Sequence, residues 1–167
     1  MKLYKEAYLD IETTGLTPMY DDITVVGIYI CDGINREIIQ LVGREATADS
    51  ILDALKDVSI IYTYNGKAFD LPFIYSRLNI NLAVLFEHHD LMYDCWRNSL
   101  YGGFKSVERQ LGIGRKLKDV NGYGAVRLWW RYVDHFDTDA LATLLEYNKE
   151  DVLNLRVLKE LLLCLKR

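Results

Sequence analysis

Two carboxylates stand two residues apart near the start of the chain, within the stretch YLDIETTG at residues 8–15. The apolar residues around Asp10 and Glu12 predict a buried strand over residues 5–12, and side chains two apart on a strand point to the same face. Burial and like-charge repulsion both disfavour this pair. A divalent cation bound by both carboxylates would offset these costs, so the pair is a candidate metal site.

A third acid interrupts the apolar stripe of the last predicted helix, residues 139–165. The stripe consists of side chains three or four residues apart, namely Leu144, Tyr147, Asp151, Leu155, Leu158 and Leu162. Charged side chains are rarely buried without a partner, so we expect Asp151 either at an edge of the core or facing a cation. Tyr147 alone could be a core aromatic, but its position one turn before Asp151 favours a place in the same site.

A fourth acid ends the stretch YNGKAFD at residues 64–70. Residues 59–65 predict a strand and 70–80 a helix, so Asp70 would lie at the sheet edge where ligands bind in α/β folds. An N-cap is the simpler explanation when this stretch is taken alone. Taken together, acids from a strand, a loop and a helix could bind a pair of Mg²⁺ or Mn²⁺ ions. These ions prefer oxygen ligands and, in pairs, promote phosphodiester cleavage.

The remaining pattern predicts an α/β fold in one domain over residues 1–167. Strands at 23–32 and 36–43 flank the turn signal Asp32-Gly33, which predicts an antiparallel hairpin. The other predicted elements are a helix at 47–58 capped by Thr47, a short strand near 87–91, and helices near 91–98, 105–111 and 124–133. Strands that alternate with helices after an initial hairpin indicate a mixed sheet flanked by helices, with parallel strands following the hairpin.

The composition favours a globular protein of 167 residues, 50% of them hydrophobic and 26% charged. No apolar run is long enough to span a membrane, and the first residues are too few and too charged for a signal peptide. The scattered Cys31, Cys95 and Cys164 argue against a disulfide framework and favour a reducing, cytoplasmic setting. The net charge of −4 argues only weakly against nucleic-acid binding, because the four proposed ligands account for −4 by themselves.

Three motifs in this order resemble those of the DEDD superfamily of 3′–5′ exonucleases, which share the RNase H-like fold. DIETTG resembles the first motif, YNGKAFD the second, and YNKED at 147–151 the third in the Y-x-x-x-D form that marks the DEDDy branch. The stretches HHDLM, SVERQLGIGR and NKEDVLNL resemble the YprB-like type of RNase H-like exonuclease domain. The resemblance covers nearly the whole chain.

This resemblance implies a role for each motif residue. Asp10 would bridge two metal ions, Glu12 and Asp151 would complete one metal site, and Asp70 would hold the other ion. Tyr147 would orient the attacking water rather than act as a base, because the ordinary tyrosine pKa is about 10.

The resemblance also implies substrate contacts beside the metal site. Thr13, Thr14 and Leu16 would contact the terminal nucleotide. Asn65 and Phe69 could contact its sugar or base, although a turn asparagine and a core phenylalanine explain these two residues equally well.

Several other polar and aromatic residues could have either a functional or a structural role. A basic segment, comprising Lys105, Arg109, Arg115, Lys116 and Lys118, could hold a phosphate backbone or form a solvated face. Asp90 could support the metal ligands or cap a helix. The adjacent His88 and His89 would point apart on a strand and are expected to have ordinary structural roles. Trp129 and Trp130 could stack on bases but are expected to pack against the protein.

The sequence therefore predicts a Mg²⁺- or Mn²⁺-dependent 3′–5′ exonuclease that uses two ions and acts on single-stranded DNA or RNA 3′ ends. The alternative enzyme is an RNase H-like endonuclease, because one fold hosts several activities. The alternative of another class is a weakly active nucleic-acid-binding subunit of a larger repair or processing complex. We expect any protein partner to act in trans, and no membrane partner.

Overall fold

The computed structural model describes residues 5–165, which contain a mixed sheet with the strand order β3-β2-β1-β4-β5. Its strands are β1 (Lys5–Thr13), β2 (Ile23–Cys31), β3 (Arg36–Val42), β4 (Val58–Thr63) and β5 (Glu87–Asp90). β2 pairs antiparallel with both β1 and β3, whereas β4 pairs parallel with both β1 and β5. The predicted fold class, a hairpin followed by parallel strands, is confirmed.

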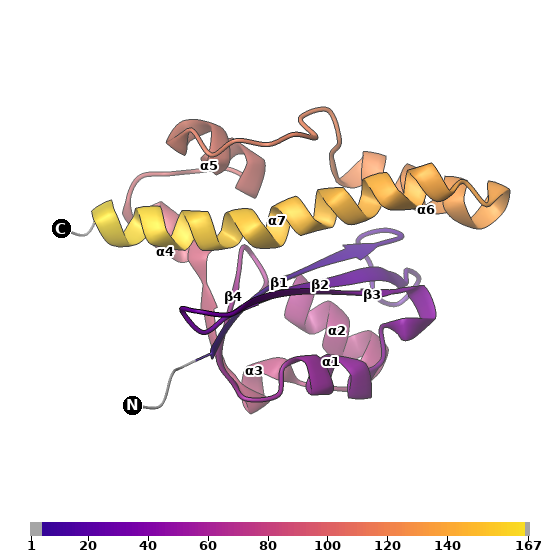
Figure 1. Cartoon of the computed structure of the whole chain (residues 1–167), viewed down its shortest axis with the longest axis horizontal. Coiled ribbons are helices and arrows are strands. Elements are labelled where there is room, and N and C mark those ends of the chain that lie inside the picture. Colours follow the sequence, from indigo (N-terminus) through magenta and orange to yellow (C-terminus); the bar gives the residue numbers. More distant parts are fainter. Residues whose placement is uncertain (1–4, 166–167) are drawn as a thin grey trace.

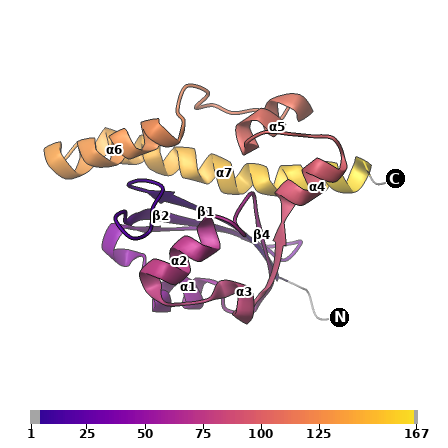
Figure 2. The ribbon, with the colours of Figure 1, turned by 180° about the vertical axis from the view of Figure 1, so that it is seen from behind.

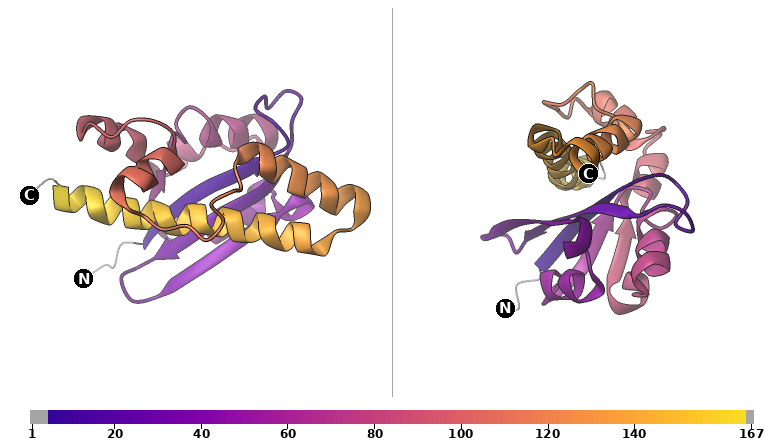
Figure 3. Two further views of the ribbon diagram at one scale, coloured as in Figure 1. Left: turned by 90° about the horizontal axis from the view of Figure 1, so that it is seen from above. Right: turned by 90° about the vertical axis from the view of Figure 1, so that its right-hand side faces the viewer.

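Helices cover both faces of this sheet. One face carries α1 (Ala48–Ala54), α2 (Asp70–Leu78) and the short α3 (Leu82–Leu85). The other face carries α4 (Leu91–Arg97), α5 (Phe104–Leu111), α6 (Gly122–His135) and α7 (Thr138–Leu165), as Figure 1 and the view from behind in Figure 2 show. α6 folds back beside α7, and the end-on view separates the sheet from the two helical layers (Figure 3).

The alternation of side chains along β1 builds both cores. Ala7, Leu9 and Ile11 belong to the cluster that includes residues of α1 and α2. Tyr8 points the other way and packs with Val152 and other apolar side chains of α7. Asp10 and Glu12 share the face of Tyr8, because side chains two apart on a strand point to the same side. The strand therefore directs both acids toward α7.

The predicted stripe of α7 is buried along its whole length, namely Leu144, Tyr147, Asp151, Leu155, Leu158 and Leu162. Asp151 thus lies inside an apolar row that faces the sheet, opposite the acids of β1. Among the helices of residues 5–165, none has the length and hydrophobicity of a transmembrane segment.

Three elements end earlier than the sequence predicts, each within a few residues before a left-handed residue. Thr47 caps α1 as expected, but the chain turns at Asp57 (φ 66°) before β4 begins. Asn65 (φ 62°) follows β4, and Asn79 (φ 56°) is the C-cap of α2. The short α3 lies where no element was predicted, and a 3₁₀ turn at Gly43–Glu45 begins on the last residue of the strand predicted over 36–43.

Candidate active site

Three carboxylates converge between β1 and α7. Asp10, Glu12 and Asp151 each offer one oxygen, and these oxygens lie within 4.8 Å of one another. Tyr147 lies one turn before Asp151 on the same helical stripe, and all four side chains line a pocket of about 700 Å³. The structure therefore brings together the acids that two distant sequence motifs supply.

Asp70 lines the same pocket from the first turn of α2. Its Oδ1 accepts a hydrogen bond at 3.0 Å from the backbone N–H of Ile11, the residue between the two acids of β1. The N-cap position of α2 belongs to Phe69, so the interpretation of Asp70 as a plain N-cap is wrong. The carboxylate is tied instead to the strand that carries the other acids.

Asp90 holds the loop that leads to Asp70. Its Oδ1 accepts the backbone N–H of Met92 at 3.1 Å, which is the expected N-cap of α4. The same carboxylate accepts the N–H of Asn65 at 2.8 Å and the N–H of Lys67 at 3.0 Å. Asp90 therefore both caps a helix and fixes the turn before Asp70.

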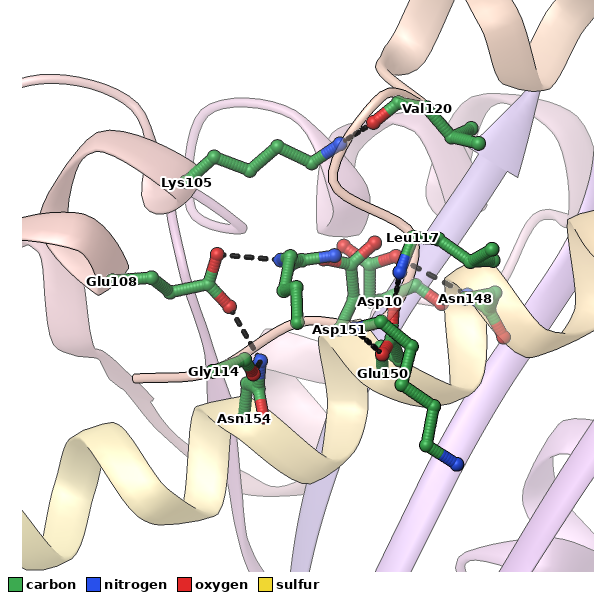
Figure 4. Close-up of polar contacts among 12 residues, drawn as sticks. Asp10, Lys105, Glu108, Gly114, Leu117, Val120, Asn148, Glu150, Asp151 and Asn154 are labelled. Carbon is green, nitrogen blue, oxygen red and sulfur yellow. Dashed lines mark hydrogen bonds and ion pairs between the residues drawn. The ribbon is translucent and has the colours of Figure 1, made fainter. Parts of the chain in front are cut away.

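Asn148 supports Asp10 from α7 (Figure 4). Its Nδ2 donates to the Asp10 carbonyl at 3.3 Å and to Asp10 Oδ2 at 3.2 Å, and Gln40 Nε2 donates to Asn148 Oδ1 at 3.0 Å. Gly27 on β2 is the residue opposite Asp10 in the β1–β2 pair. A Cβ at this glycine would lie 2.1 Å from Asn148 Oδ1. This contact was not predicted, although a glycine inside the strand ITVVGIYI signals close approach of another group.

Arg115 is buried behind Asp151. Its Nε donates to Glu108 Oε2 at 2.6 Å and its Nη2 pairs with Asp151 Oδ1, which leaves only 6% of the arginine side chain exposed. The expectation that Arg115 shares an exposed phosphate-binding face is therefore wrong, because these two carboxylates draw it into the interior. Arg109, Lys116 and Lys118 remain exposed, and Lys116 Nζ lies 3.8 Å from Glu146.

The segment that links α5 to α6, residues 112–121, is fastened to α7. Glu150 accepts the backbone N–H of Lys116 at 2.6 Å and that of Leu117 at 3.2 Å (Figure 4). The ion pair of Arg115 with Asp151 adds a second attachment one residue further along the helix. This linking segment therefore packs on the same turn of α7 that supplies an acid to the pocket.

Burial and mutual repulsion raise the pKa of the clustered carboxyls. The pKa values of Asp10 and Glu12 lie well above the ordinary range, first because of burial and then because of the Asp151 and Asp70 charges. Burial raises the pKa of Asp70 to about 7 and that of Asp151 to about 6, the latter against the opposing effect of the neighbouring arginine. The pKa of Tyr147 is also raised, mainly by burial. The cluster therefore favours a bound proton or cation.

The predicted substrate contacts line this pocket as a group, comprising Thr13, Thr14, Leu16, Asn65, Phe69 and Lys105. The Thr13 hydroxyl donates to the Gly15 carbonyl at 2.5 Å, and Thr14 Oγ1 accepts the Asp22 N–H at 2.9 Å. Both hydroxyls thus shape the loop after β1. Leu16 is 83% exposed at the rim of the pocket.

Phe69 and Lys105 each have a structural contact beside their place in the pocket. The Phe69 ring packs against Phe73 with centroids 5.5 Å apart. Lys105 Nζ lies 4.2 Å from the centroid of the Tyr147 ring and donates to the Val120 carbonyl (Figure 4). The rest of the wall, which was not predicted, includes Tyr64, Phe104, Tyr123 and Val126.

The histidine and tryptophan pairs lie outside this pocket. His88 hydrogen-bonds Thr63 Oγ1 at 2.8 Å and His89 contacts Asp94, so both rings have structural contacts as expected. Trp129 packs beside the cluster around Leu144, also as expected. The expectation of packing is wrong for Trp130, which is 45% exposed because it borders a surface hollow rather than the core.

The donor set fits a divalent cation that prefers oxygen. Within residues 5–165, the group of acidic, histidine and cysteine side chains close enough to share an ion consists of Asp10, Glu12 and Asp151. Asp70 lies outside this group of three, yet its charge contributes to the raised pKa of Asp10. An all-carboxylate set is typical of Mg²⁺ and Mn²⁺ sites.

A family model described as RNase_H superfamily matches residues 7–163. The chain belongs to the RNase H superfamily. A curated relative, the uncharacterized protein YprB of Bacillus subtilis (strain 168), is 30% identical over 171 residues. The match covers 89% of this chain and 39% of YprB, so the chain spans about two fifths of that relative. The predicted resemblance to the YprB-like type is confirmed.

Solved structures share the fold of this RNase H superfamily member. The family B DNA polymerase of the hyperthermophilic archaeon Pyrobaculum calidifontis aligns with a TM-score of 0.72 and 18% identity, over 96% of this chain and 24% of the polymerase. NrnC of Brucella melitensis aligns with a TM-score of 0.62 and 22% identity, over 94% of this chain and 71% of NrnC. The same protein has also been solved bound to pGG. These alignments establish the RNase H-like fold.

Proposed function

We propose that this RNase H superfamily member is a divalent-metal-dependent 3′–5′ exonuclease of the DEDDy branch. Its substrates would be single-stranded DNA or RNA 3′ ends. The observation that carries the proposal is the convergence of Asp10, Glu12 and Asp151 oxygens within 4.8 Å, in a pocket that Asp70 and Tyr147 also line.

The four carboxylates would hold two Mg²⁺ or Mn²⁺ ions. When bound, such ions lower the pKa of a coordinated water and stabilise charge on phosphate oxygens. Two side chains of the protein orient the carboxylates that would bind the metal: the neutral amide of Asn148 and the guanidinium of Arg115. Asn148 donates to Asp10, and Arg115 pairs with Asp151. Groups that orient metal ligands in this way commonly strengthen metal binding and activity.

Tyr147 would position the attacking water. Burial and the charge of Asp151 raise the pKa of its hydroxyl, so the phenol stays protonated at neutral pH. A protonated phenol both donates and accepts hydrogen bonds, and it does not act as a base there. The ring is held by Lys105, whose Nζ lies 4.2 Å from its centroid.

The pocket wall would receive the terminal nucleotide. The exposed Leu16 on one rim and the aromatic side chains of Phe69, Phe104 and Tyr123 offer apolar surface for a base and a sugar. Lys105 supplies a cation in the same wall. The occurrence of NrnC with bound pGG supports an oligonucleotide ligand for this fold.

Cleavage of 5′-labelled single-stranded DNA and RNA of one sequence tests the proposal. Wild type, Asp10→Asn and the matched control Asp134→Asn, an exposed acid on α6, are incubated with Mn²⁺, Mg²⁺ or EDTA. A metal-dependent ladder that shortens from the 3′ end, absent only for Asp10→Asn, supports the exonuclease. Cutting of circular or 3′-blocked substrates identifies an endonuclease instead. Binding of both strands without any cleavage overturns the proposal in favour of a binding subunit.

A further inference from the structure

A second hollow lies beside the active-site pocket. Its volume is about 320 Å³, and Thr14 lines both spaces. Arg44 contributes to its wall from the turn after β3, Arg77 from the end of α2, and Trp129 and Trp130 from α6. None of these four residues belongs to the motifs of the proposed exonuclease.

One face of α6 connects the two spaces. Tyr123 and Val126 line the active-site pocket, whereas Trp129 and Trp130 line the second hollow. Spacings of three and four residues place these side chains on one side of a helix. From Tyr123 to Trp130 the helix advances about 10 Å, at 1.5 Å per residue. The helix therefore forms a continuous wall from one space to the other.

The loop between β1 and β2 contributes Thr14 to both spaces and exposes three large apolar side chains. Leu16, Met19 and Tyr20 are 83%, 74% and 82% exposed. The loop is nevertheless held in place, because the N–H of Thr17 donates to Asp21 Oδ2 at 2.9 Å. Large apolar side chains on an ordered loop offer surface to the flat faces of bases.

The second hollow combines an exposed aromatic ring with cationic groups. Trp130 is 45% exposed, while Trp129 is half-buried. Arg44 is exposed and makes no ion pair within the described range 5–165. Arg77 pairs with Asp22, which also lines the hollow, so Arg44 is the cation more available to a ligand. Stacking rings beside guanidinium groups are how proteins hold single-stranded nucleic acid.

We propose that this second hollow is a stacking subsite for the single strand whose 3′ end occupies the active-site pocket. Trp130 stacks on a base upstream of the scissile bond, and Arg44 contacts the adjoining phosphate. The loop between β1 and β2, which contributes Thr14 to both spaces, supports the intervening nucleotides. This inference rests on the proposed exonuclease function and specifies how a longer strand is held.

Binding of labelled oligonucleotides in EDTA tests the subsite separately from cleavage. The ligands are a single-stranded octamer and a 5′-phosphorylated dinucleotide, which reaches only the active-site pocket. Trp130→Ala and Arg44→Gln are compared with Trp96→Ala, a ring 44% exposed on α4, and with Arg36→Gln, an exposed arginine on β3. Thermal melting verifies that all four variants are folded.

We expect Trp130→Ala to weaken octamer binding by about 5- to 150-fold, which is the usual cost of one lost base stack. The loss for the dinucleotide is expected to be much smaller, and Trp96→Ala should match wild type for both ligands. Quenching of tryptophan fluorescence by the octamer should also decrease in Trp130→Phe.

Equal affinities of Trp130→Ala and wild type for the octamer would overturn the subsite. So would equal losses for the octamer and the dinucleotide. If wild type shortens 3′ ends but Trp130→Ala shows no length-dependent defect, the subsite fails and the exonuclease stands. If wild type binds the octamer through Trp130 but cleaves nothing, the exonuclease fails and the binding surface stands.

Discussion

Arg115 and Asp151 form an ion pair whose two side chains are only 6% and 9% exposed. The guanidinium also donates to Glu108, so one buried cation serves two buried carboxylates. This neighbour lowers the pKa of Asp151, which burial alone would raise above about 6. The proposed metal ligand on α7 is thus kept in place and partly ionised by a residue far away in the sequence.

Replacement of Arg115 tests this arrangement. Arg115→Met would leave both carboxylates buried without their cation, and removal of one partner from a buried pair costs about 3–5 kcal/mol. We expect the free energy of unfolding in EDTA, measured by urea denaturation, to fall by this amount. Arg115→Lys keeps the charge and should lose less. The exposed neighbour Lys116, changed to Met, serves as the control and should stay within about 0.5 kcal/mol of wild type. A fully stable Arg115→Met would contradict the importance of the pair.

Gly27 offers a second test, because it leaves room for the amide that holds Asp10. In Gly27→Ala the new Cβ would lie 2.1 Å from Asn148 Oδ1, so the amide must move. We expect a loss of about 1–3 kcal/mol in unfolding free energy, typical of overpacking. We also expect a decrease in cleavage of about 10- to 100-fold, as for lost support of a metal ligand.

Two further variants show whether the Gly27 effect passes through Asn148. Gly114→Ala places a Cβ in open space and should leave stability near wild type. The double variant Gly27→Ala/Asn148→Ala removes the clash, so it should be more stable than the sum of the single losses predicts. Strict additivity would show that the two residues do not interact.

The positions of acids that follow the repeat of a strand or a helix could be predicted from the sequence. The positions of residues that depend on contacts between distant segments could not. Asp10 and Glu12 obey the period of a strand and Asp151 that of a helix, so their convergence could be anticipated. Arg115 shares a basic segment with exposed lysines, and nothing local separates it from them. Its burial depends on two acids, one of them 36 residues away.

The second hollow could not be predicted from local sequence patterns either. Its wall combines the loop after β1, the turn after β3, the end of α2 and the middle of α6. No periodic pattern relates these segments, because they meet only through the order of the strands. The element ends were missed for a different reason, since Asp57 and Asn79 take left-handed conformations that their residue types permit but do not require.

The raised carboxyl pKa values predict an unusual dependence of stability on pH without metal. In the folded chain the pKa of Asp70 is about 7 and that of Asp151 about 6, against about 4 in an unfolded chain. Between about pH 4 and pH 7, the folded state therefore binds more protons than the unfolded state. Stability should fall as pH rises from about 5 to 8 in EDTA, by a few kcal/mol in total. Asp70→Asn, which removes one titrating group, should flatten this decline.

Metal should reverse the trend, because cations compete with protons for the same oxygens. Millimolar Mg²⁺ or Mn²⁺ should raise the melting temperature more at pH 8 than at pH 5. Melting curves over this range, with and without EDTA, measure both effects. A metal-dependent shift that is equal at all pH values, or absent, would argue against binding to the raised-pKa carboxylates.

Tyr147→Phe separates positioning of water from packing of the ring. The ring contact with Lys105 survives the change, so the melting temperature and the metal-induced shift should stay close to wild type. Cleavage should nevertheless decrease by about 10²- to 10³-fold, as for other single hydrogen-bonding groups that act on the reacting atoms. Tyr123→Phe, an exposed hydroxyl in the wall of the same pocket, is the matched control and should cleave nearly as well as wild type. Equal activity of the two variants would reduce Tyr147 to a packing residue. A large loss confined to Tyr147→Phe would place its hydroxyl at the reacting water, because neither stability nor metal binding would account for the defect.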